Sequence, residues 1–157
     1  MNYSALIQNR KSVREFADKK VSAAALAEIE AYYQKSCQRL VPELETKLCV
    51  FGEEAKAALE GAAGYESFLV GAPNYLVLLS AKGDLAVENA GYMMEDLVLK
   101  LTDMDLGCCW ITFTDSEKVK SALKIDSALD VAAIVAFGQE DKTTKRVRVN
   151  ILSMSKV

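Results

Sequence analysis

Two long apolar runs dominate the hydrophobic pattern of the chain: "YLVLLSA" over residues 75–81 and "VAAIVAFG" over residues 131–138. A run of this length without charged residues is typical of a strand that is covered on both faces of its sheet. Two shorter runs predict further strands over residues 47–51 ("KLCVF") and 108–113 ("CCWITF"). The pattern therefore predicts a sheet with residues 75–81 as a central strand and residues 131–138 as another buried strand.

Helix patterns and helix-end signals occupy the segments between these runs. Ser22 and Asp84 stand where N-caps are expected, and "TDSE" over residues 114–117 matches a capping box. Pro42 and Gly61 mark two helix ends. The sequence predicts helices over residues 3–10, 22 to about 39, 53–61, 64–70, 84–107 and 114 to about 123.

The predicted helix over residues 84–107 is apolar on more than one side. One band of residues marks its first side, and a second band makes the apolar surface wider than a surface helix needs. In a domain of this size, such a helix suggests that another subunit covers part of it. The first band is Ala90, Met94, Leu97, Leu101 and Met104, and the second is Val87, Gly91, Val98 and Leu106.

The order of these elements predicts the fold class. Residues 146–152 ("RVRVNIL") alternate charged and apolar side chains, which fits a half-exposed edge strand. Helices and strands intermix without the strict alternation of a doubly wound parallel sheet. We therefore expect an α+β fold with helices packed about a single sheet, in one domain over residues 1–157.

Composition and charge exclude several classes of function. The 157 residues carry 19 Lys and Arg against 22 Asp and Glu, so no global positive field attracts nucleic acid or anionic lipid. The sequence shows no apolar run long enough to span a membrane and no secretory signal, which predicts the cytoplasm. The chain contains no histidine, and its cysteines lack metal-ligand spacing. Metal catalysis and histidine-dependent triads are therefore not expected.

One cationic cluster stands out against this negative net charge. Arg10, Ser12 and Arg14 are spaced two apart in "RKSVREF", so an extended segment would place them on one face. Two guanidinium groups and a hydroxyl are good partners for a phosphate. Arg146 and Arg148 form a second pair by the same spacing. A solvated basic turn is the alternative interpretation of the first cluster.

At this point the sequence resembles the flavin-dependent nitroreductases, a family sometimes grouped with the small NADH oxidases. "RKSVREF" is similar to the N-terminal Arg-x-Ser-x-Arg-x-Phe/Tyr motif of that family, and "KRVRV" is similar to its terminal basic pair. Three strand blocks match between them in the right order: "GAPNYLVLLS", "LGCCWI" and "VAAIVAFG". Each block is weak alone, but the ordered set spans nearly the whole chain.

The resemblance implies a central, mostly antiparallel sheet flanked by helices, in an intertwined homodimer with FMN at the interface. It also implies ping-pong hydride transfer, in which NAD(P)H reduces the flavin and an electrophilic acceptor such as a nitro compound or quinone reoxidises it. No side chain has to act as a catalytic residue, because the cofactor carries the chemistry. The cofactor-binding residues implied by position are Arg10, Lys11, Ser12, Arg14, Trp110, Ile111, Thr112, Phe113, Arg146 and Arg148.

The sequence departs from the family where a polar block usually contacts the flavin ring. The segment "QRLVPELETKLCVF" keeps only Pro42 of that block. This departure leaves a second hypothesis open, a non-catalytic member of the fold that binds or senses flavin. A third hypothesis is an α+β domain whose basic residues serve only surface solvation.

Other conspicuous residues have ordinary structural interpretations. Trp110 is interpreted as a core aromatic at a strand end rather than as a stacking surface. Cys108 and Cys109 are interpreted as small buried hydrophobic residues rather than as a redox pair. Glu95 and Asp96 are interpreted as a polar helix edge rather than as an acid/base pair.

Overall fold

A single antiparallel sheet forms the centre of the protein in the computed structural model, which describes residues 1–66 and 68–143. Its four strands lie in the order β1-β2-β4-β3, and each neighbouring pair is antiparallel. The predicted strand over residues 146–152 lies outside the described residues. The strands are β1 (Thr46–Phe51), β2 (Asn74–Ser80), β3 (Gly107–Ile111) and β4 (Asp130–Gly138).

Burial along the strands follows from their place in the sheet. β2 and β4 pair with each other in the middle, and all seven residues of β2 are buried. The continuous apolar runs therefore correctly predicted strands covered on both faces. β3 ends at Ile111, so Thr112 and Phe113 follow the strand instead of completing it.

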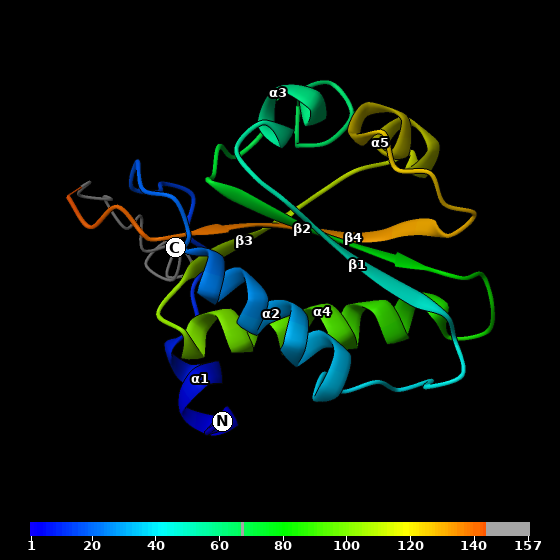
Figure 1. Cartoon of the computed structure of the whole chain (residues 1–157), viewed down its shortest axis with the longest axis horizontal. Coiled ribbons are helices and arrows are strands. Elements are labelled where there is room, and N and C mark those ends of the chain that lie inside the picture. The colour runs from blue at the N-terminus through cyan, green and yellow to red at the C-terminus, as the bar shows by residue number, and fades with distance from the viewer. Residues whose placement is uncertain (67, 144–157) are drawn as a thin grey trace, which may run out of the picture.

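Helices cover both faces of this sheet (Figure 1). One face carries α1 (Tyr3–Asn9), α2 (Ala23–Lys35) and α4 (Ala86–Asp103). The other face carries α3 (Ala55–Leu59) and α5 (Ser116–Leu123). A separate cluster of buried apolar residues lies on each side of the sheet. The predicted α+β class, with a central antiparallel sheet flanked by helices, is confirmed.

Several predicted helix ends are wrong. α2 ends at Lys35, well before Pro42, because Ser36 leaves helical geometry. Asp84 does not cap α4: Leu85 holds the N-cap position, with φ 60°, and α4 ends at Asp103. The helix expected over residues 64–70 does not form among the described residues.

The N-caps of α2 and α5 show which side chain marks the first residue of each helix. The Ser22 hydroxyl accepts a hydrogen bond from the Ala25 N–H at 3.1 Å, as the sequence predicts for α2. In the predicted capping box the cap is Asp115, whose side chain accepts from the Lys118 N–H at 3.1 Å. Thr114 therefore precedes the cap instead of forming it.

The chain itself covers most of α4. Met93, Met94, Leu97, Val98 and Leu101 are fully buried between the sheet and the helices of the same face. These positions therefore need no cover from another subunit, and the expectation that a second subunit covers part of the helix stays a prediction. Val87, on the same helix, stays 83% exposed.

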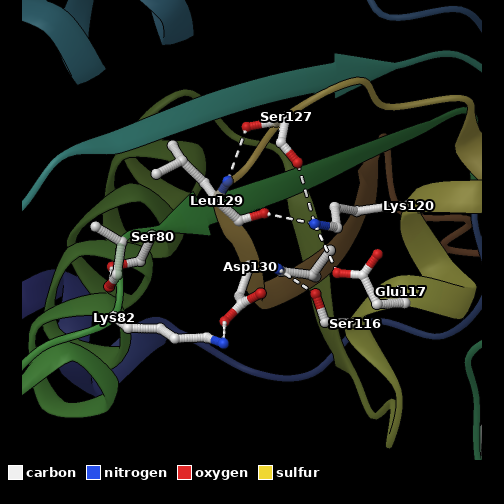
Figure 2. Close-up of polar contacts among 10 residues, drawn as sticks. Ser80, Lys82, Ser116, Glu117, Lys120, Ser127, Leu129 and Asp130 are labelled. Atoms are coloured by element: carbon white, nitrogen blue, oxygen red, sulfur yellow. Dashed lines mark hydrogen bonds and ion pairs between the residues drawn. The ribbon is translucent and has the colours of Figure 1, made fainter.

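A buried lysine fixes the start of β4 (Figure 2). Lys120 of α5 donates from Nζ to the carbonyl oxygens of Ser127 and Leu129, at 3.1 and 3.0 Å, and pairs with Glu117 at 2.8 Å. The Ser116 hydroxyl accepts from the Val131 N–H at 2.8 Å. The first two turns of α5 thus hold the loop that leads into β4.

No helix within the described ranges combines the length and apolar character of a membrane span.

Candidate functional site

The cationic segment runs beside the edge strand β3. Ser12 pairs with Cys108 in a parallel bridge, and the Val13 N–H donates to the Cys108 carbonyl at 2.9 Å. A Cβ on Gly107 would lie 2.8 Å from Val13 Cγ2, so a glycine in β3 allows this close approach. The segment is therefore extended at Ser12 and Val13, which decides between the extended and the turning form that the sequence left open.

Arg10 lies where this segment leaves α1, and it lines a cavity of about 280 Å³ together with Lys11. Arg10 Nε lies 3.2 Å from Glu95 Oε1, within ion-pair distance. The two atoms do not meet the geometry of a hydrogen bond, so Nε is buried without a hydrogen-bond partner in the described chain. Lys11 Nζ pairs with Glu140 Oε1 at 2.7 Å. We call this space the Arg10 cavity.

Arg14 lines a second cavity of about 500 Å³, together with Trp110, Ile111 and Thr112. Its side chain makes no ion pair within the described part of the chain, and the residue is exposed. We call this space the Arg14 cavity. Four of the predicted cofactor-binding residues therefore meet at one cavity, whereas Arg10 and Lys11 meet at the other.

Trp110 is not a core residue. It is 36% exposed and belongs to neither buried cluster, which corrects the sequence-based interpretation, because the edge strand β3 leaves one side of this residue open. Its indole Nε1 donates to Glu95 Oε2 at 3.2 Å. Glu95 thus lies between Arg10 and Trp110, one oxygen near each. No sequence signal identifies this role, since Glu95 occupies an ordinary polar helix position.

Two other predicted residues, Ser12 and Phe113, line neither of these cavities. Ser12 is half-buried between Arg10 and Arg14. Phe113 lines a different cavity of about 730 Å³, with Val87 and Lys82. Arg146 and Arg148 lie outside the described residues.

Two residues that the sequence reasoning missed also line the Arg14 cavity, Tyr65 and Phe68. Both belong to the segment for which a helix was predicted. Gly61 and Gly64 stand three residues apart just before it and both have positive φ. Two such glycines are typical of a loop, and this signal could have argued against the helix.

Asp96, next to Glu95 in sequence, is buried, so the interpretation as a polar helix edge is wrong for Asp96, whereas the Glu95 side chain stays 44% exposed. The Asp96 carboxylate accepts hydrogen bonds from the Tyr3 and Tyr32 hydroxyls, at 2.9 and 2.8 Å, and from the Gln38 N–H at 3.0 Å. Burial, followed by its hydrogen bonds to Tyr3 and Asp96, raises the pKa of Tyr32 far above its ordinary value. This cluster holds α1 and α2 against α4, which fixes where α1 delivers Arg10.

Three of the four cysteines, Cys37, Cys108 and Cys109, are buried. Cys108 and Cys109 are 1% and 5% exposed and form no disulfide, in agreement with their interpretation as small buried residues. Burial raises the pKa of the Cys108 thiol to about 11, with nearby Arg10 acting in the opposite direction. Burial raises the pKa of Cys37 to about 12. Neither thiol carries the charge of a nucleophile near neutral pH.

The fold and the site together define an α+β protein with cation-lined cavities at the edge of its sheet. A sequence profile of the family described as "Putative TM nitroreductase" matches residues 2–157. The chain belongs to this nitroreductase family, and the resemblance inferred from its motifs is confirmed. No curated protein matches the sequence.

Several solved structures share the fold of this chain. A nitroreductase family protein from Clostridium novyi NT is 22% identical, covers 94% of this chain and 89% of its own, and has a TM-score of 0.76. An FMN-dependent nitroreductase from Clostridium difficile R20291 is also 22% identical, with coverages of 97% and 95% and a TM-score of 0.72. A "putative nitroreductase in complex with FMN" from Desulfovibrio desulfuricans is 18% identical, with coverages of 98% and 95% and a TM-score of 0.76.

Proposed function

We propose that this protein is an FMN-dependent oxidoreductase that uses NAD(P)H to reduce an electrophilic acceptor such as a nitro compound or a quinone. The observation that carries the proposal is the meeting of Arg14, Trp110, Ile111 and Thr112 at one cavity beside the extended cationic segment. Membership of the nitroreductase family supports it. Two proteins of the same fold supply the cofactor class, one named FMN-dependent and one described in complex with FMN.

The residues present fit a flavin mononucleotide. The buried Arg10 Nε lacks a hydrogen bond, and Arg14 has no ion pair among the described residues. Both guanidinium groups can therefore still donate to an anionic or carbonyl oxygen. The Arg14 cavity, at about 500 Å³, lies within the usual 300 to 1,000 Å³ range of small-molecule sites.

Each side chain has a binding or orienting role in this proposal. Arg14 and the backbone of Ile111 and Thr112 would contact the ring, beside Trp110. Arg10, Lys11 and Ser12 would contact the ribityl phosphate from the neighbouring segment, and Phe113 would lie further out. Arg146 and Arg148, outside the described residues, are proposed as further phosphate ligands on the basis of the family motif alone.

A bound flavin would supply the redox chemistry, the uptake of a hydride from NAD(P)H and the transfer of two electrons to the acceptor. The protein contributes orientation and exclusion of water, which agrees with a chain that has no histidine. Glu95 holds Trp110 and Arg10 in place from the side of α4, through contacts of 3.2 Å to each. No residue is assigned as catalytic.

The first test measures FMN affinity in purified protein from which bound flavin has been removed. We expect Arg14→Ala to raise the Kd for FMN about 10- to 100-fold, because a charge-assisted hydrogen bond is worth about 1.5 to 3 kcal/mol. Lys35→Ala, which removes an exposed cation from the last turn of α2, is the matched control and should leave the Kd unchanged. Equal affinity of both variants would place the flavin away from Arg14.

A second test separates turnover from binding alone. Under anaerobic conditions, NADH or NADPH should bleach the flavin absorbance, and a nitroaromatic compound or a quinone should restore it. Bound FMN that no nicotinamide nucleotide reduces would favour the alternative, a flavin-binding or sensing protein. A chain that takes up no FMN would contradict both functions and leave the basic segment as surface solvation.

A homodimer with FMN at its interface is part of the same proposal. Three apolar side chains in and next to α4 support it, because they remain exposed on the single chain: Leu85 at 58%, Val87 at 83% and Tyr92 at 47%. Gly91 lies among them, and a Cβ at that position would meet no atom within 4 Å. One domain over residues 1–157 and a cytoplasmic location remain predictions from the sequence.

A further inference from the structure

Tyr65 and Phe68 are the most exposed aromatic side chains in the described chain, at 71% and 66%. They lie between α3 and β2, and both line the Arg14 cavity. Large exposed aromatic side chains at a cavity mouth usually mark a binding surface, because water solvates their faces poorly. Neither residue has a role in the packing of the two buried clusters.

The backbone around this pair is fixed in place. The Tyr65 N–H donates to the Phe68 carbonyl at 2.9 Å, and the Phe68 N–H donates to the Tyr65 carbonyl at 2.8 Å. The Gly64 N–H donates to the Thr112 carbonyl at 2.7 Å, which ties the pair to the residue after β3. These bonds hold the backbone of Gly64, Tyr65 and Phe68 beside the residue that follows β3, which lowers the entropy cost of binding.

Gly64 is required for this arrangement. Its φ is +104°, a conformation that side chains rarely adopt, and a Cβ there would lie 2.3 Å from the Phe68 carbonyl oxygen. The chain therefore uses a glycine where the backbone of Phe68 returns over it. Gly64 thus allows the backbone conformation that positions Tyr65 and Phe68 in the connection between α3 and β2.

The other walls of the cavity complement a planar ring with polar edges. Trp110 supplies a third aromatic side chain, whose orientation is held by its hydrogen bond to Glu95. Val70, Cys109 and Ile111 supply apolar surface, and Arg14 supplies the cation. Glu66 also lines the cavity and adds a negative charge, which disfavours a wholly anionic ligand. The set suits an uncharged aromatic ring system with carbonyl groups at one end.

We propose that Tyr65 and Phe68, together with Trp110, form the aromatic surface that binds the tricyclic ring of the flavin. This inference rests on the proposed function, and it names how the ring is held in a chain whose sequence lacks the usual polar block. Ring binding here depends on contact between aromatic faces, while Arg10 and its neighbours bind the phosphate.

Riboflavin is the probe that tests the ring site, because it carries the tricyclic ring but no phosphate. We expect Tyr65→Ala and Phe68→Ala each to raise the Kd for riboflavin about 5- to 100-fold, the loss typical of one stacking contact. Leu40→Ala removes an apolar side chain that is 51% exposed and lines neither the Arg10 cavity nor the Arg14 cavity, and it is the control. Tyr65→Phe and Phe68→Tyr keep an aromatic face and should retain wild-type affinity.

The readout can be the fluorescence of Trp110, the single tryptophan of the chain, which a bound flavin quenches. Because Tyr65 and Phe68 are exposed, their removal should leave the thermal unfolding midpoint unchanged, so weaker binding cannot be ascribed to unfolding. Wild-type protein that binds neither FMN nor riboflavin would contradict the proposed function itself. Wild-type protein that binds both, with alanine variants of equal affinity or altered only in oligomeric state, would overturn this inference alone.

Discussion

Glu95 shows how one side chain can organise a site without being part of the chemistry. Its two carboxylate oxygens lie 3.2 Å from Arg10 Nε and from Trp110 Nε1. Arg10 comes from the end of α1 and Trp110 from β3, so a residue of α4 sets the relative position of two segments far apart in sequence. The carboxylate also neutralises a guanidinium that is largely buried, which lowers the cost of burying it.

Cys108 gives a prediction about stability and pH at the residue scale. Burial raises the pKa of its thiol from 9.0 to about 11 in the folded protein. Below pH 9 both states keep the proton, and the full stabilisation is present. As pH rises from 9 towards 11, the unfolded chain loses the proton first, so stability falls by at most about 1.4 kcal/mol per pH unit.

Urea unfolding of the wild type and of Cys108→Ala, measured at several pH values in the presence of reductant, tests this prediction. The free energy of unfolding should favour the wild type most below pH 9, and the difference should shrink towards pH 11. Cys37 is present in both proteins, so its own titration cancels. A difference that stays constant over the range would mean that the thiol is hydrated.

Sequence reasoning reached some residues of the site and not others, for a physical reason. The period-two spacing of Arg10, Ser12 and Arg14 places them on one face in the case of an extended segment, and the segment is extended beside β3. The partners of Arg10 and Trp110 depend on which helix packs against β3. Local patterns carry no information about that packing, so Glu95 could not be identified.

At the scale of elements, polar side chains of α4 hold a long irregular segment. Asn89 is fully buried, and its Oδ1 accepts from the Leu40 and Val41 N–H groups, both at 2.9 Å. Asp96, almost two turns later on the same helix, accepts from the Gln38 N–H at 3.0 Å. These bonds satisfy backbone donors that α2 would have satisfied if it had continued to residue 39, as the sequence predicted.

Strands were predicted better than helix ends for a related reason. A strand covered on both faces needs an uninterrupted apolar run, and β2 and β4 show one. A helix end depends on which competing hydrogen bonds the tertiary structure offers. Asn89 and Asp96 offer them after α2, and the backbone of Thr112 offers one to Gly64 in place of the helix predicted over residues 64–70.

Lys120 gives a prediction at this scale, because it joins α5 to the start of β4. Lys120→Met keeps the aliphatic stem but leaves the Ser127 and Leu129 carbonyls without their donor. We expect the free energy of unfolding to fall by about 1 to 2 kcal/mol, since a charged hydrogen bond is worth about 1.5 to 3 kcal/mol and removing a buried charge offsets part of the loss.

The matched control is Lys118→Met, two residues away on the exposed side of α5. Exposed substitutions of this kind usually change stability by less than about 0.5 kcal/mol. Chemical denaturation of the two variants and the wild type gives the comparison. Equal stability of Lys120→Met and wild type would show that water can replace the ammonium group at both carbonyls.

On the scale of the whole molecule, the sheet separates two buried cores. The helix α4 has one side buried against the sheet and another side that is exposed to solvent. Its inner positions are fully buried by the same chain. Its outer positions include Val87 and Tyr92, which are exposed, and Gly91 between them. A glycine in the middle of a helix lowers helix stability by about 1 kcal/mol relative to alanine. No atom of the described residues packs so closely against Gly91 that only a glycine would fit there.

A partner helix that approaches closely at Gly91 would supply a reason for this glycine, and this gives the last prediction. If the proposed homodimer uses the outer face of α4, Gly91→Leu should dissociate it, because the added side chain occupies the space of the partner's backbone. The protomer itself should fold at least as stably as before, since a Cβ at Gly91 meets nothing within 4 Å among the residues that the structure describes. Lys118→Leu adds the same side chain to an exposed position of α5, on the other face of the sheet, and should leave the dimer intact.

Sedimentation equilibrium over a range of protein concentrations measures the oligomeric state of both variants, and thermal unfolding confirms that the variants fold. A wild-type protein that is monomeric throughout would contradict the homodimer, whereas a dimer that tolerates leucine at Gly91 would move the interface to another surface.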